Sequence, residues 1–390
     1  MNKKVILINI AVLLILLIIS DLGIGLLYNR LAPASGKLNI DIMLGRISTD
    51  KLLNERPHPY MLWENTPEFI SKGIRQINKQ GYRNEKDTGA LEPGTLRILA
   101  LGGSATWGYL LDGPGDAWPA QLENKLNENI AGTKYKKVEV INAGLNYATS
   151  AELLSHYIYR DRYLGSKIVI MNTGDNDIAP LLFHDYDPEY THFRPGWNGR
   201  TDSLGRTERW LVEHSNIIKL IYAFRRRNSI TLPQINKQAE SFDLPEEYYL
   251  ENVKKNQPIG LERNLDLLIR NILADGSLPV LFAPIFASDK QYNGLSGEAA
   301  TRAALIRNVR KAAVIGMAKD LEVIKQLSAK YQIPLIEIPS DRIPLEYFLD
   351  HNHLSKEAAT IEGQIVAEHI LKLLQSGQTS TTNPRLVSGL

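Results

Sequence analysis

The chain contains no cysteine. This absence excludes disulfide frameworks, thiol nucleophiles and thiolate metal sites, so any nucleophile must be an alcohol, an amine or a carboxylate. A chain without thiols also suits an oxidising compartment such as a bacterial periplasm. Excess charge of one sign is lacking too, because 390 residues carry a net charge of only +2. That balance argues against a nucleic-acid partner, and we interpret the basic run 225–227 as a solvated helix end.

Long apolar runs are scarce as well, and the one that exists covers residues 5–27, interrupted by a single charge at Asp21. About 20 such residues cross a bilayer. Two lysines precede the run, which favours a cytoplasmic N-terminus with the rest of the chain outside, in the periplasm or at the cell surface. We therefore predict an uncleaved signal-anchor over residues 1–27. A cleaved signal peptide is the alternative, because Ala32-Pro33-Ala34 has the small-x-small form of a cleavage site.

The remaining chain has ordinary globular composition, with 44% apolar and 23% charged residues. Residues 28–95 mix proline, glycine and charge and are predicted to form a stalk and an N-terminal embellishment. The breaker cluster at residues 91–94 introduces the main domain, predicted over residues 96–376. The tail 377–390 is rich in Ser, Thr and Asn and is predicted to be disordered.

Short apolar runs alternate with helical stretches in the main domain. This alternation predicts an α/β fold, a three-layer flavodoxin-like sandwich with a five-stranded parallel sheet, preceded by the transmembrane helix. Functional groups in such sheets lie beyond the carboxyl ends of the strands. The predicted strands are 97–101, 138–141, 168–171, 280–283 and 335–338, and the predicted helices are 116–129, 150–163, 260–274, 300–330 and 356–375.

One connection, from about residue 178 to 258, is far longer than the usual loop between strands. Its first part, residues 183–197, is dense in aromatic residues and histidine, and its middle, residues 210–227, has a helical pattern. We predict that this insertion forms a lid or a substrate wall.

The first predicted strand leads directly into Gly102-Gly103-Ser104, which places Ser104 on a tight turn at the carboxyl end of the strand. A hydroxyl there is exposed, and the Ser104 amide can face a developing oxyanion. By itself a Gly-Gly-Ser turn is more often only a turn. The motif is not the Gly-x-Ser-x-Gly elbow, because Thr106 stands where that motif needs glycine.

The next two strands deliver polar groups to the same edge. Gly144 ends one strand and Asn176 follows the other. A backbone amide at Gly144 and a side-chain amide at Asn176 could donate to an oxyanion. Taken singly, Asn176 is more often a turn residue that hydrogen-bonds its own backbone.

The last strand is followed by Asp350, His351, Asn352 and His353. Asp350 and His353 are three apart, which allows the carboxylate to hold one imidazole nitrogen while the other faces a serine. The His-x-His pair could instead ligate a metal with Asp350, but so short a loop rarely wraps one ion. We therefore expect neither a metal nor an organic cofactor, and we treat His351 as a bystander.

The ordered set of Ser104, Gly144, Asn176 and Asp350-x-x-His353 resembles the motifs of the SGNH (GDSL-like) hydrolase family. The resemblance covers residues 96–375. The resemblance implies that Ser104 is the nucleophile, that His353 is the base oriented by Asp350, and that Ser104, Gly144 and Asn176 form the oxyanion hole. Asp177 matches the acidic residue that follows the family's asparagine, with a structural role. The chain departs from the pattern at position 103, where the family has aspartate and this chain has glycine. A glycine at this position is similar to a subset of membrane-anchored bacterial members.

The implied reaction is hydrolysis of an acyl ester. The alternatives are an O-acyltransferase that uses the same residues and a membrane-tethered binding protein without activity. An aromatic-rich insertion on a tethered enzyme suggests an acylated cell-envelope carbohydrate as the substrate, since sugar faces stack on aromatic rings. Equally, those aromatics could pack the insertion's own core. Acyl-chain length and oligomeric state are left open.

Overall fold

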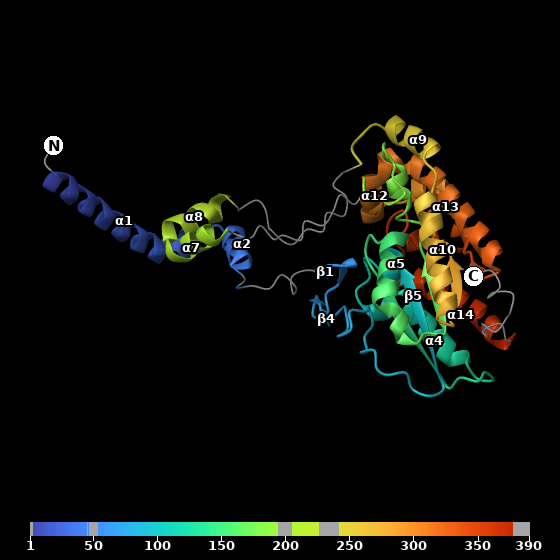
Figure 1. Ribbon diagram of the computed structural model, residues 1–390. Coiled ribbons are helices and arrows are strands. Elements are labelled where there is room, and N and C mark those ends of the chain that lie inside the picture. Colours follow the sequence, from blue (N-terminus) through green and yellow to red (C-terminus); the bar gives the residue numbers. More distant parts are fainter. Residues whose placement is uncertain (1–2, 45, 47–53, 194–204, 226–241, 377–390) are drawn as a thin grey trace. The chain divides into compact units, whose positions relative to one another are not determined.

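The computed structural model describes residues 3–44, 46, 54–193, 205–225 and 242–376. Its larger unit is built around a five-stranded sheet (Figure 1). The strands follow the order β6-β5-β7-β8-β9, and every neighbouring pair is parallel. Each strand overlaps its predicted run, and the order is that of a flavodoxin-like sheet. The predicted fold class is therefore confirmed. The strands are β5 (Thr95–Gly102), β6 (Lys137–Gly144), β7 (Ile168–Asn172), β8 (Leu278–Phe282) and β9 (Leu335–Ile336).

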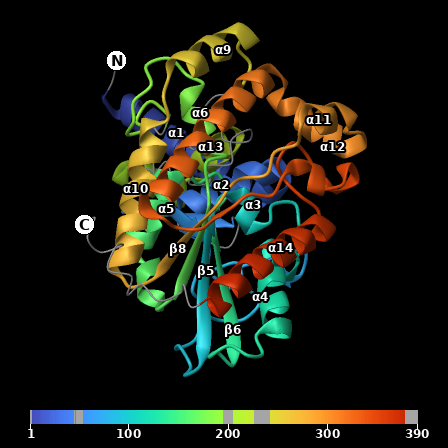
Figure 2. The same cartoon turned by 90° about the vertical axis from the view of Figure 1, so that its right-hand side faces the viewer.

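Helices cover both faces of this sheet (Figure 2). On one face, α4 (Trp118–Asn129) and α14 (Lys356–Gln375) pack against Leu96 and Ile98 of β5. On the other face, Leu99 and Leu101 of the same strand are covered by α5 (Ser150–Tyr159), α10 (Ile259–Ala274) and α13 (Arg310–Tyr331). Successive strand residues point to opposite faces, and both faces are buried here, which explains why the strand runs are continuously apolar.

Shorter elements complete this sheet unit. The helix predicted over residues 300–330 is divided into α12 (Gly297–Ala303), a 3-10 segment (Ala304–Val309) and α13, and the helix predicted over 150–163 continues beyond α5 as a 3-10 segment (Asp161–Leu164). The other helices are α3 (Ser104–Trp107), α6 (Ile178–Leu181), α9 (Glu246–Lys255) and α11 (Asp289–Gly294), with 3-10 turns at Pro114–Asp116, Ser340–Arg342 and Leu345–Tyr347.

Residues 54–95 lie against the sheet, whereas they were expected to belong to a stalk and embellishment. They form two antiparallel hairpins, β1 (Glu55–His58) with β2 (Leu62–Asn65) and β3 (Ile70–Ser71) with β4 (Ile74–Arg75). The Asn84 side chain accepts from Asn142 N and donates to Val140 O of β6, at 2.9 and 2.8 Å. The segment thus covers an edge strand whose backbone groups would otherwise be unpaired.

Within the described residues, four helices form a second unit, which we call the helical unit (Figure 1). It contains α1 (Lys3–Leu31), α2 (Ala34–Met43), α7 (Arg206–His214) and α8 (Asn216–Arg225), joined by a buried cluster that includes Tyr28, Ile40, Val212 and Ala223. Among the described residues, α1 is the one helix long and apolar enough to cross a membrane. The predicted N-terminal apolar helix is therefore present.

The long insertion after β7, which was expected to form a lid or a substrate wall, is divided between the two units. Residues 206–225 pack on α1 and α2, because Ile218, Leu220 and Ala223 of α8 belong to the apolar cluster of the helical unit. Residues 178–193 and 242–258 stay in the sheet unit. Trp197 and the tail 377–390 lie outside the described residues.

Candidate active site

Ser104 begins α3 immediately after β5, at the carboxyl edge of the sheet. Gly102 is required there for space, since a Cβ at this position would lie 2.1 Å from Thr106 Oγ1 and 2.6 Å from Asn172 O. Gly103 has an ordinary negative φ of −80°, so close approach and not backbone conformation explains both glycines. Ser104 is buried in this turn, with 8% of its surface exposed.

A polar network attaches α3 to the ends of three strands. Thr106 Oγ1 donates to Asn172 Oδ1 at 3.1 Å, and Asn142 Nδ2 donates to Thr106 O at 2.8 Å. Asn172 Nδ2 in turn donates to Phe282 O at 3.2 Å. Because every partner is buried and paired, the network holds the Ser104 turn in one position.

The loop after β9 brings Asp350 and His353 to Ser104. His353 Nε2 lies 2.8 Å from Ser104 Oγ, and His353 Nδ1 lies 2.7 Å from Asp350 Oδ2. The other carboxylate oxygen accepts from the backbone amides of Asn352 and His353, at 2.9 and 2.8 Å. Burial raises the pKa of Asp350, but the hydrogen bond and charge of His353 outweigh it and hold this pKa well below its usual range. Asp350 is therefore ionised at neutral pH.

His351 belongs to the same loop but points elsewhere. Its ring packs against Phe286, with centroids 5.6 Å apart, and its Nδ1 is 3.7 Å from Asp350 Oδ1. Burial lowers the pKa of His351 to about 4, so the ring is neutral at neutral pH. The described residues contain no group of three His, Asp or Glu side chains arranged to hold a metal ion.

Asn176 lies beside the Ser104 turn. Its Nδ2 donates to Ala148 O at 2.9 Å. A Cβ on Gly103 would lie only 2.5 Å from this nitrogen, so the amide occupies the space that a larger residue 103 would need. A side chain at position 103 would therefore have to displace the Asn176 amide.

Gly144 does not reach the pocket, and its prediction as an oxyanion donor is wrong. Its amide donates to Asn142 Oδ1 at 2.9 Å. A Cβ at Gly144 would lie 2.3 Å from Trp107 N, so this glycine allows α3 to pack closely on β6. The same connection instead delivers Tyr147, with a φ of +60°, to the pocket.

Asp177 makes the structural contacts that the resemblance implied. It accepts from Ser150 N and Ser150 Oγ at 2.9 and 2.6 Å, and from Tyr190 Oη at 2.8 Å. Burial raises the pKa of Asp177 to about 6. These bonds attach the start of α5 and the insertion to the end of β7.

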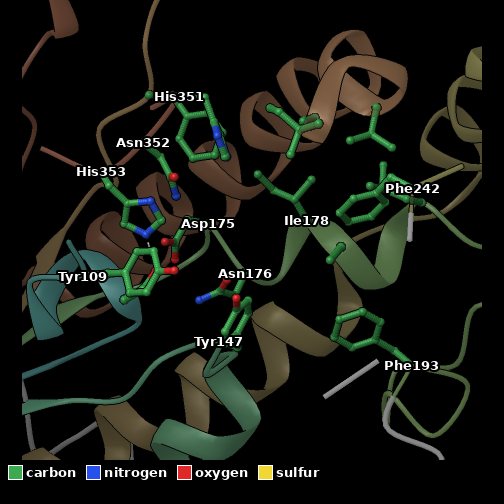
Figure 3. Close-up of a pocket in the computed structure, with 17 residues that line it drawn as sticks. Tyr109, Tyr147, Asp175, Asn176, Ile178, Phe193, Phe242, His351, Asn352 and His353 are labelled. Atoms are coloured by element: carbon green, nitrogen blue, oxygen red, sulfur yellow. Dashed lines mark hydrogen bonds between the residues drawn. The ribbon is translucent and has the colours of Figure 1, made fainter. Parts of the chain in front are cut away.

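A pocket of about 510 Å³ opens from Ser104 into the sheet unit. Figure 3 shows its polar end, with Tyr109, Asp175, Asn176 and His353, and the aromatic rings of Phe193 and Phe242 toward the other end. Burial raises the pKa of Asp175 at the polar end. The apolar part of the lining comes from α6, the rest of the insertion, the loop after β8 and the 297–331 region: Ile178, Ala179, Leu182, Phe193, Phe242, Phe286, Ile306, Val309 and Ala313.

Sequence reasoning missed most of this pocket. Asp175 adjoins Asn176 and could have been noticed by its place after a strand, whereas Ala313 and Val309 carry no local signal. The aromatic residues of the insertion mainly form a buried cluster with α9 and α13, which includes Phe183, Tyr190 and Tyr249. Of the insertion's rings, Phe193 and Phe242 line the pocket.

Comparison with known proteins identifies the family. The model of the GDSL-like lipase/acylhydrolase family matches residues 98–366, whereas no curated protein matches the chain. Similar solved structures include an acetylxylan esterase from Geobacillus stearothermophilus (13% identity, 73% of this chain and 96% of that one, TM-score 0.37). A lipase/acylhydrolase from Enterococcus faecalis (14%, 70% and 95%, 0.38) and the esterase EstA from Pseudoalteromonas sp. (15%, 72% and 98%, 0.36) are also similar. The chain therefore belongs to the GDSL-like lipase/acylhydrolase family and is an ester-hydrolysing enzyme.

Proposed function

We propose that ester hydrolysis proceeds through Ser104, His353 and Asp350. The observation that carries this proposal is the continuous chain of hydrogen bonds from Ser104 Oγ through both nitrogens of His353 to Asp350, with distances of 2.8 and 2.7 Å. His353 Nε2 takes the Ser104 proton as Oγ attacks the ester carbonyl, and then gives it to the leaving alcohol. Water, deprotonated by the same nitrogen, releases the acyl group. Asp350 stabilises the intermediate imidazolium.

Two donors are proposed for the oxyanion, the backbone amide of Ser104 and the side chain of Asn176. The Asn176 amide carries two protons, and one is used by Ala148 O. The second can therefore be directed at the carbonyl oxygen beside Ser104. Such a donor contributes most when charge develops in the transition state.

The apolar pocket supports an ester with an extended apolar acyl chain. Its volume of about 510 Å³ falls in the range of ordinary ligand sites, and an acetyl group would leave most of it unfilled. Burying each methylene contributes about 0.8 kcal/mol. We propose an acylated cell-envelope carbohydrate or a similar ester, with its acyl chain among Ile178, Phe242 and Ala313 and its alcohol near Asp175.

We further propose that α1 is an uncleaved anchor and that the sheet unit is extracytoplasmic. The two lysines before the apolar run and the absence of cysteine support this orientation.

The decisive experiment compares the wild type with Ser104→Ala on a series of p-nitrophenyl esters. The variant should lose esterase activity and keep its circular dichroism spectrum, because only one hydroxyl is removed. A fluorophosphonate probe should label the wild type at Ser104 and leave the variant unlabelled. Turnover that survives the substitution would refute the serine mechanism. Adding alcohol acceptors to the wild-type reaction separates hydrolysis from transfer, since a transferase would form the new ester in preference to the free acid.

A further inference from the structure

Asp21 of α1 is capped by the start of α8, although 194 residues separate it from Ser215. One Asp21 oxygen accepts from Ser215 Oγ and Ile217 N, at 2.7 and 2.9 Å. The other accepts from both nitrogens of Asn216 at 3.1 Å. The N-terminus of a helix carries partial positive charge, so this carboxylate is both paired and stabilised by α8.

The packing between these helices is close. A Cβ at Gly25 of α1 would lie 2.7 Å from Asn216 Nδ2, and a Cβ at Gly36 of α2 would lie 2.0 Å from Ala223 O. Lys219 lies over the Tyr28 ring, 4.7 Å from its centroid. The contacts pass from Asp21 to Tyr28 along α1 as they pass from Ser215 to Lys219 at the start of α8. The first part of α8 therefore lies beside the C-terminal part of α1. Removal of α1 as a cleaved leader would uncover this whole surface.

The depth of Asp21 follows from the length of α1. Residues 5–20 rise roughly 24 Å at 1.5 Å per residue, and the hydrocarbon layer is about 30 Å thick. If Val5 marks the inner boundary, Asp21 lies near the outer one. An unpaired carboxylate at such a depth is unfavourable, so the hydrogen bonds from the start of α8 stabilise Asp21 there.

The outer surface of α7 and α8 has the composition of a membrane interface. Trp210 is 59% exposed, Ile221 47% and Phe224 44%. Ile221 and Phe224 are three apart on α8 and so share a face. Exposed Arg30 and Arg225 lie in the same unit. Tryptophan and basic residues beside an apolar helix are typical of the lipid headgroup layer.

We propose that α7 and α8 form an interfacial hairpin that caps Asp21 and lies in the outer leaflet of an anionic phospholipid bilayer, with α1 retained in the mature chain. Its occupant is the lipid, because Ile221 and Phe224 are exposed on a helix that packs beside α1, which is apolar enough to cross a membrane. Arg30 and Arg225 of the same unit can contact anionic headgroups. The proposal rests on the proposed anchor and topology but not on the catalytic residues, so activity in the same preparation reports separately on the serine mechanism.

The absence of native cysteine makes the test direct. Single cysteines at Trp210, Ile221 and Phe224, and at the exposed Tyr163 of the sheet unit as a control, are labelled with the fluorophore NBD in the full-length chain. The protein is then reconstituted in vesicles of phosphatidylethanolamine and phosphatidylglycerol. Labels on α7 and α8 should emit further to the blue than the Tyr163 label and should be quenched by spin-labelled lipid. Equal emission and equal quenching at all four positions would overturn the proposal.

Two aspartates provide a matched pair for the capping step. Asp21→Leu should make the Ile221 label more accessible to an aqueous quencher, whereas Asp21→Asn, which keeps one acceptor oxygen, should preserve part of the protection. Asp41→Leu on α2 is the control, because Asp41 pairs with Arg46 at the surface of the same unit. Identical accessibility in Asp21→Leu and Asp41→Leu would contradict the cap. Intact mass of the membrane-extracted chain should include α1, and a chain that begins near Ala34 would refute retention.

Discussion

His351 and His353 have ring centroids 6.4 Å apart and planes inclined by 76°, but they relate differently to Asp350. His353 Nδ1 lies 2.7 Å from the carboxylate, whereas His351 Nδ1 lies 3.7 Å from it. His353 also meets Ser104 Oγ at 2.8 Å through its other nitrogen. The carboxylate thus orients one imidazole toward the serine and leaves its neighbour in an apolar wall.

This difference predicts unequal effects of the two histidines. His353→Ala should reduce kcat on the order of 10⁴-fold or more, and Asp350→Asn by at most about 10⁴-fold, because the latter misorients the ring without removing it. His351→Ala should change the rate less than about tenfold. Steady-state kinetics with and without a chelator provide the measurement. Comparable losses at both histidines, together with inhibition by the chelator, would favour a metal site.

Gly103 offers a second prediction, because a side chain there must displace the Asn176 amide. Gly103→Asp, which restores the residue typical of the family, should lower kcat about 10²- to 10³-fold, the effect of losing one oxyanion donor. Asn176→Ala should cost about 3 kcal/mol of transition-state stabilisation. The double variant should have a kcat no lower than that of the weaker single variant, since both substitutions remove the same oxyanion donor, the Asn176 amide. Gly89→Ala, at a site with nothing within 4 Å, is the control. Additive losses would show that Gly103 acts independently of Asn176.

The apolar pocket predicts a dependence on acyl-chain length. Wild-type kcat/KM should rise about fourfold per methylene until the pocket is full, from about 0.8 kcal/mol each. Ala313→Phe should lower the octanoyl-to-acetyl ratio of kcat/KM at least about tenfold, since the ring fills the space meant for the chain. Ala318→Phe, on the exposed side of the same helix, should leave the ratio unchanged. A wild-type ratio favouring acetyl would rule out the acyl-chain assignment while leaving the serine mechanism intact.

Glu362 predicts a pH dependence of stability. Burial raises the pKa of this carboxyl to about 8, so the folded state binds a proton that the unfolded chain releases above its ordinary value near 4.5. The folded state therefore binds more protons between these values, and the free energy of unfolding should fall as pH rises from about 4.5 to about 8. Glu362→Gln should flatten this fall. Urea unfolding of both proteins at pH 5 and pH 8.5 measures it, and parallel losses in the two proteins would assign the effect to other groups.

The proposed topology predicts the behaviour of reporter fusions. Alkaline phosphatase placed after Leu390 should be active, because this reporter folds into its active form only outside the cytoplasm. A cytoplasmic reporter at the same position should be inactive. The reverse pattern would place the sheet unit in the cytoplasm.

The sequence was sufficient for the parts of the molecule that rest on local periodicity. The five strands have continuous apolar runs because both faces are buried, and Ser104, Asn176, Asp350 and His353 all follow strand ends that a parallel sheet brings to one edge. The sequence also indicated the helical pattern over residues 210–227.

Contacts between segments that are distant in the chain could not be predicted from the sequence. Gly144 matched the expected order of residues, but only the structure shows that its amide is used by Asn142 and its Cα faces Trp107. In the same way, Asp21 looked like an interruption of a membrane span, and nothing local indicated a cap supplied by Ser215 and Asn216. Such pairings depend on how distant segments pack and leave no periodic trace.

The separation of Asp21 from its cap has a consequence for biosynthesis. Ser215 is made 194 residues after Asp21, which corresponds to roughly 10 to 40 s at the usual rates of translation. During that interval α1 has emerged while its carboxylate has no partner from α8. Asp21 must therefore have other partners, such as water, until β5, β6 and β7 have been synthesised and residues 215–217 follow. Completion of the helical unit thus follows synthesis of the first three strands of the sheet.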